Sequence, residues 1–154
     1  MSQPWTALFT ISRQFYMEKN LDGITQDQAD NPPAARVNSV TWLLTHLVGN
    51  RRLLLRTALK SSYQPTDAAP ETLARLRAAM DESQAAMEEA FDAIADWNEP
   101  RLHPLAQTSM PLDQIVGTFF MDEAYHLGQV GTARKLLGMP GVLKAPQAQA
   151  HAMS

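Results

Sequence analysis

The residues most capable of chemistry lie near the C-terminal end of the sequence, where Asp122 and His126 are one helical turn apart. A third candidate, His46, lies far back in the sequence on another apolar segment. Two imidazoles and one carboxylate from two helices can hold a divalent metal ion and leave coordination positions open. This donor set suits zinc, nickel, iron or manganese better than calcium or magnesium. We therefore take His46, Asp122 and His126 as a candidate metal site.

The surroundings of these residues favour an inward-facing site. Residues three or four positions apart share a helix face, and the face that carries Asp122 and His126 begins apolar and turns polar halfway along. His46 also lies among residues expected to point inward, and a carboxylate buried between helices needs a compensating cation or hydrogen bonds. Three more polar residues are in register to orient ligands or a bound water: Asn50, Tyr125 and Gln129.

The same residues also have a simpler interpretation. Asp122 and His126 form a common i,i+4 spacing that can be an exposed pair on a helix surface. His46 can be an interior histidine whose ring nitrogens are satisfied by hydrogen bonds. The spacing alone does not choose between a metal site and this ordinary structural role.

Other ionisable residues give weaker signals. His103 lies in a proline-rich loop and is expected at the surface. Arg51 and Arg52 are expected to be solvated helix charges, and Glu123 is expected to face solvent or a partner helix. No serine-nucleophile motif or phosphate-binding glycine loop occurs in the sequence.

The composition indicates one globular domain. The chain has 154 residues, of which 45% are hydrophobic and 19% are charged. Its net charge of -3 argues against a nucleic-acid partner, and the absence of cysteine removes disulfides, thiolate ligands and a cysteine nucleophile. Neither a signal-peptide pattern nor an apolar run of about 20 residues occurs, so we expect a cytoplasmic protein without a membrane partner.

Hydrophobic periodicity predicts an all-α protein with four helical segments and no strand. Prolines suit the first positions of three segments, Asn38 or Ser39 caps another, and Gly138 ends the last. The segments span about residues 4–20, 38–60, 70–97 and 111–138. A four-helix bundle over residues 1–140 follows. We expect residues 141–154 to form a tail that is mobile or an arm onto a neighbouring subunit.

Two segments resemble the DinB-like superfamily. Asn-Ser-Val-Thr-Trp-Leu-Leu-Thr-His-Leu, at residues 38–47, resembles the helix with a metal-binding histidine in that family. Asp-Glu-Ala-Tyr-His-Leu-Gly-Gln-Val, at residues 122–130, resembles its last-helix signature, which continues to Arg-Lys-Leu-Leu-Gly at 134–138. The likeness covers about residues 1–140. It implies a bacterial four-helix bundle with up-down-down-up connectivity, commonly a homodimer, that binds a divalent metal at three histidines.

The resemblance aligns His46 and His126 with two of those histidines and Asp122 with the third. A carboxylate preserves a three-ligand set, but it lowers the net charge of the metal site. The metal should therefore pull less strongly on a bound water or thiol. Zinc or nickel is the ion implied by the family, and Asp122 shifts the preference towards iron or manganese.

The resemblance also supplies a function, because some relatives are S-transferases or isomerases that use thiols such as bacillithiol or mycothiol. Our first hypothesis is a metal-dependent transferase that takes its thiol from outside, since the chain has no cysteine. Tyr125 or Gln129 would then position the incoming group. Two alternatives remain: a metal-dependent hydrolase with the same ligands, and a non-catalytic metal-binding or stress-response bundle.

Overall fold

The structure is a computed structural model that describes residues 4–142, and this part of the chain is predominantly helical. A continuous N-terminal segment consists of α1 (Pro4–Ile11), the π-helical η1 (Ser12–Met17) and α2 (Glu18–Leu21). The short α3 (Gln26–Asp30), α4 (Val40–Arg56), α5 (Leu73–Asp92), β1 (Pro100–Leu102), β2 (Ser109–Pro111) and α6 (Leu112–Leu136) follow. The all-α prediction is confirmed. Most of the predicted tail, from residue 143 onward, lies outside the described residues.

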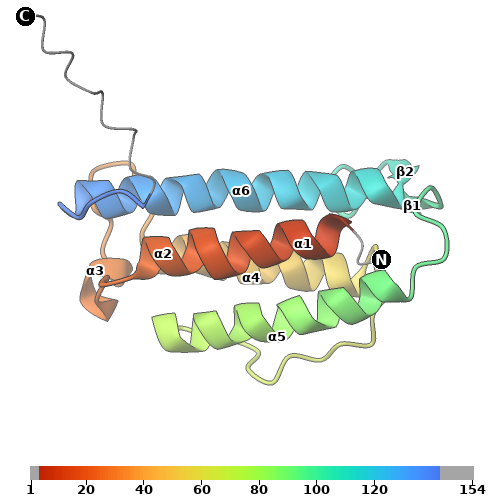
Figure 1. The fold of residues 1–154 in the computed structure, drawn as a ribbon, viewed down its shortest axis with the longest axis horizontal. Helices are drawn as coiled ribbons and strands as arrows, with labels where there is room; N and C mark the ends of the chain where they lie inside the picture. The colour runs from red at the N-terminus through yellow and green to blue at the C-terminus, as the bar shows by residue number, and fades with distance from the viewer. Residues whose placement is uncertain (1–3, 143–154) are drawn as a thin grey trace, which may run out of the picture.

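Figure 1 shows the N-terminal segment, α4, α5 and α6 lying side by side along the long axis of the molecule. The N-terminal segment and α6 run in one direction, and α4 and α5 run in the opposite direction. A long connection over residues 57–72 returns the chain along the molecule between α4 and α5. Within residues 4–142, none of the helices has the length and apolar character needed to cross a bilayer.

Local side-chain caps explain where several helices begin. The Ser39 hydroxyl accepts a hydrogen bond from the Trp42 backbone N–H, so the predicted cap of α4 is present. α5 begins three residues later than predicted from Pro70, because Thr72 provides its cap. Gly138 has a φ of +79° and ends α6 as predicted, because glycine adopts this conformation without steric cost.

The predicted absence of strands is wrong for the segment before α6. β1 and β2 form an antiparallel pair in which Arg101 lies opposite Met110. Pro100 and Pro111 lie opposite each other at one end of this short ladder and hid it from the sequence pattern, because Pro cannot donate a ladder hydrogen bond. The hairpin closes one end of the helical layer.

His103, predicted at the surface, is buried in the turn of this hairpin. Its Nδ1 accepts hydrogen bonds from the backbone N–H groups of Leu105 and Ala106. The Thr118 hydroxyl donates to the Ile115 carbonyl, which leaves its oxygen to accept from His103 Nε2–H at 2.8 Å. These bonds make His103 a structural residue that ties the hairpin to α6.

The core consists of two apolar clusters. One surrounds Leu47 and Met80 towards the α3 end, and the other surrounds Phe9 and Phe119 towards the hairpin end. A buried polar layer separates the two clusters along each of the four long segments. Each segment contributes one residue to it: Ser12, Arg51, Gln84 and Glu123.

An ion pair between Arg51 and Glu123 is the centre of this layer, and each residue is only 2% exposed. The guanidinium donates through Nε and Nη2 to the two carboxylate oxygens, both at 2.7 Å. Arg51 also donates to Gln84 Oε1 at 3.0 Å, and the Ser12 hydroxyl donates to Glu123. The prediction that Arg51 is a solvated charge is wrong, and of the two alternatives for Glu123, solvent or a partner helix, the structure shows the partner helix.

We predict that Glu123→Ala lowers the free energy of unfolding by about 3–5 kcal/mol, because it leaves Arg51 buried without a counter-charge. Urea unfolding at neutral pH measures this loss. The double variant Arg51→Met/Glu123→Leu should recover most of it, since neither charge then needs desolvation. Glu89→Ala, at an exposed position of α5, is the control and should change stability by no more than about 0.5 kcal/mol. A loss as small as the control's would contradict the role assigned to the pair.

Candidate metal centre

The centre lies on the seam between α4, which carries His46, and α6, which carries Asp122 and His126. The buried ion pair is adjacent to it in both helices, because Arg51 follows Asn50 and Glu123 follows Asp122. Since the bidentate ion pair fixes how far α4 slides along α6, it also fixes which side chains meet on the neighbouring, more exposed face.

The three predicted ligands are brought together. One donor atom from each of His46, Asp122 and His126 lies within 4.8 Å of the other two. His46 Nε2 is 3.5 Å from one Asp122 carboxylate oxygen, and His126 Nε2 is 3.4 Å from the other. The two imidazole rings meet edge to face, with their centroids 4.4 Å apart.

The hydrogen bonds around the two rings determine which of their nitrogens are acceptors. His126 Nδ1 lies 3.1 Å from Gln129 Oε1, so Nδ1 carries the proton and Nε2 is left as an acceptor facing Asp122. The Asn50 amide donates to Asp122 Oδ2 at 2.6 Å and to His46 Nε2 at 3.1 Å, so that nitrogen is an acceptor as well, and a metal ion would take over its single lone pair from the Asn50 N–H. Three acceptors therefore converge, an arrangement that a cation stabilises.

The centre opens to solvent. The Asp122 side chain is 40% exposed and that of His46 is 33% exposed, while His126 is more deeply buried at 12%. The expectation that Asp122 is buried among helices is therefore wrong. Desolvation of its carboxylate is not a reason to expect a cation here. The convergence of acceptors carries that argument instead, and the open side leaves room for an incoming molecule.

An exposed tryptophan lies beside the centre, on the face of α4 that carries His46. Trp42 is 48% exposed and stacks on the His46 ring, with an angle of 4° between the planes and centroids 5.3 Å apart. Tyr125, also exposed, contacts the His126 ring edge to face. The four-residue spacing of Trp42 and His46 was the available signal, since such residues share a helix face. Both aromatic side chains therefore present exposed surface beside the histidines of the centre.

The comparisons with known proteins now bear on this site. The family model described as DinB superfamily matches residues 13–130 of the chain. The protein belongs to the DinB superfamily. Among solved structures, a conserved protein from Enterococcus faecalis has a similar fold, with a TM-score of 0.70 and 17% sequence identity over 90% of this chain and 98% of that one. No curated protein matches the sequence.

In this DinB-superfamily protein, the spacing of the donor atoms fits a small divalent ion. Zinc binds imidazole and carboxylate at about 2.0–2.2 Å, so neighbouring ligands around one ion lie roughly 3–3.5 Å apart. The two histidine–carboxylate separations of 3.4 and 3.5 Å fall within that range. The donors and their spacing therefore fit the metal that the resemblance implies.

We predict that protein prepared without a nickel column binds one equivalent of a divalent ion in calorimetric titrations with zinc, nickel, iron(II) and manganese. Asp122→Ala and His126→Ala should each weaken binding by more than about tenfold, because each removes a donor. The affinity should fall as the pH is lowered, since protons compete for the imidazole and carboxylate lone pairs.

Asp92→Ala, at an exposed position of α5, is the matched control and should leave metal affinity unchanged. If the wild-type protein binds none of the four ions, then His46, Asp122 and His126 are a polar cluster rather than a metal centre.

Proposed function

We propose that this DinB-superfamily protein binds one divalent metal ion through His46, Asp122 and His126, and that it is a metal-dependent S-transferase for an external low-molecular-weight thiol. The observation that carries the metal proposal is the convergence of three acceptor atoms, held by the amides of Asn50 and Gln129, at a centre that opens to solvent. The transferase proposal rests in addition on the thiol chemistry that the family resemblance implies.

A bound divalent cation supplies positive charge that favours the thiolate form of a thiol placed beside it. The residues of the chain arrange that environment. Asn50 donates to Asp122 and to His46, so it holds two of the donor groups together. Gln129 accepts the Nδ1–H of His126 and so fixes its tautomer, and a hydrogen bond of this kind raises the basicity of a ligating imidazole.

The thiol must come from another molecule, because the chain contains no cysteine. Trp42 and Tyr125 offer exposed aromatic surfaces next to the histidine rings, where part of the incoming molecule can pack. Zinc or nickel is the proposed ion. The carboxylate of Asp122 gives iron or manganese a better chance than three histidines would, and it moderates the pull of the ion on the thiol.

Two other functions use the same centre. A metal-dependent hydrolase would activate water with the same ligands, and a non-catalytic bundle would only hold the ion. The exposure of His46 and Asp122 favours a catalytic role over a storage role, because an ion held only for structure is usually closed off by a complete set of protein ligands.

We also propose the assembly that the resemblance implies: a cytoplasmic bacterial homodimer whose protomers are four-helix bundles with up-down-down-up connectivity. The directions of the four long segments in Figure 1 support this connectivity. Sedimentation velocity measures the oligomeric state directly.

We predict that the metal-loaded protein accelerates attack of bacillithiol or mycothiol on monobromobimane. In this reaction a carbon–sulfur bond forms, bromide leaves and the thiol proton passes to solvent. The rate should fall by at least about tenfold in Asp122→Ala and His126→Ala, because the ion that favours the thiolate is lost. Fluorescence of the bimane adduct measures the rate, and Asp92→Ala is the control.

Metal-dependent cleavage of ester or amide substrates without thiol transfer would identify a hydrolase instead. Stoichiometric metal binding with neither activity would leave the non-catalytic bundle as the function.

A further inference from the structure

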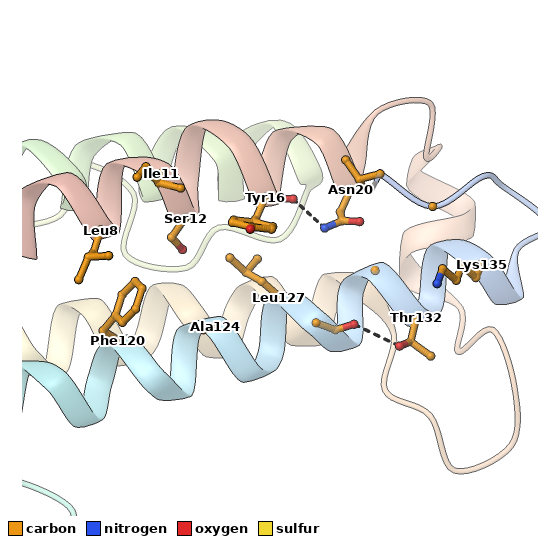
Figure 2. Close-up of a pocket in the computed structure, with 14 residues that line it drawn as sticks. Leu8, Ile11, Ser12, Tyr16, Asn20, Phe120, Ala124, Leu127, Thr132 and Lys135 are labelled. Atoms are coloured by element: carbon orange, nitrogen blue, oxygen red, sulfur yellow. Dashed lines mark hydrogen bonds between the residues drawn. The ribbon is translucent and has the colours of Figure 1, made fainter. Parts of the chain in front are cut away.

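A groove lies between the N-terminal helical segment and α6, and its lining includes none of the three candidate metal ligands. Figure 2 shows side chains from both elements pointing into the space between them, among them Leu8, Phe120 and Leu127. The groove has a volume of about 510 Å³, within the range of about 300–1,000 Å³ that is typical of small-molecule sites.

The floor and walls of the groove are mainly apolar. Ala124, Gly128 and Gly131 provide a floor without large side chains, so a ligand can approach the backbone of α6. Leu8 and Phe120 enclose the end near the start of the chain (Figure 2). From Phe120 to Lys135 the helix extends by about 22 Å, which gives the groove the shape of a channel for a linear molecule.

The opposite end of the groove is polar, and it contains a buried amide. Asn20 is 6% exposed, and its Nδ2 donates to the Tyr16 carbonyl at 2.8 Å. Its Oδ1 faces Gly131 of α6, accepts no hydrogen bond within residues 4–142 and is not sealed from solvent, so it remains able to accept. The Thr132 hydroxyl at the same end donates to the Gly128 carbonyl, so its oxygen remains able to accept.

Lys135 is the charged side chain in the lining, and in the described part of the chain it forms no ion pair. The carbonyl groups at this end of α2 do not oppose an anion strongly, because the Arg134 guanidinium binds the carbonyls of Asn20 and Asp22. Thus the groove combines a long apolar channel with a positive charge at one end.

We propose that this groove binds a linear amphiphile with an anionic head group, of the fatty-acid type. The hydrocarbon chain lies over Gly128 towards Phe120, and the carboxylate pairs with Lys135. The proposal does not depend on the metal centre. A second copy of this chain fits less well, because a flat helix face would leave the buried end of the groove at Asn20 unfilled.

The test uses decanoate as the probe and Gly128→Leu as the blocking variant. A Cβ atom at Gly128 meets nothing within 4 Å, so the added side chain enters the groove without disturbing the fold. Displacement of anilinonaphthalene sulfonate fluorescence measures decanoate affinity, which should fall at least about tenfold in Gly128→Leu. Gly49→Leu on α4 is the matched control, since its Cβ also meets nothing within 4 Å and Gly49 lies outside the groove.

The head-group assignment has its own variant. Lys135→Gln should weaken decanoate by about threefold, the loss of one exposed ion pair, and leave decanol unchanged. Equal effects of Gly128→Leu and Gly49→Leu would overturn the groove as the binding site, and equal effects of Lys135→Gln on the two probes would overturn the anionic head group. A wild-type dimer that Gly128→Leu dissociates in sedimentation velocity would assign the groove to a second copy of the chain.

Discussion

The rest of the structure depends on the buried ion pair between Arg51 and Glu123. Removing two charges from water is costly, and the cost is offset here because each guanidinium nitrogen of Arg51 donates a hydrogen bond to a protein acceptor. The bidentate geometry is satisfied at one relative position of α4 and α6, so it selects their register in a way that interchangeable leucines do not. The polar layer draws one residue from each long segment and thereby also ties the N-terminal segment and α5 to that register.

The candidate metal centre follows from this register. Asn50 and Asp122 are the sequence neighbours of the two paired residues, and they meet on the adjacent, half-exposed face of the same seam. There the balance of hydrogen bonding reverses, because the polar layer matches donors to acceptors whereas the centre gathers acceptors from His46, Asp122 and His126. The ion pair and the candidate metal centre are therefore only one residue apart in each helix but have different roles. The ion pair holds the helices together, and the centre offers acceptors that suit a cation.

α6 serves two surfaces at once, because its 3.6-residue period distributes neighbouring positions around the helix. Asp122, His126 and Gln129 face the seam with α4, while Ala124 and Gly128 line the groove beside the N-terminal segment. Glycines and alanine on the groove side leave a hollow, and longer polar side chains on the α4 side fill the seam. The chemistry of the two surfaces differs accordingly, since one gathers metal donors and the other offers an apolar channel.

The sequence by itself determined the helical class, most helix ends and the identity of the three candidate ligands, because these depend on local spacing, caps and residue type. The cap at Ser39 and the terminator Gly138 are examples that lie within a few residues of their effect. Tertiary structure decided which charges are buried. Glu123 lies four residues from both Phe119 and Leu127 and so shares their apolar face. The opposing Arg51 offsets the cost of burying a carboxylate at that position. The exposure of Trp42, the burial of His103 and the hairpin were likewise set by contacts between distant segments, which one-dimensional periodicity does not contain.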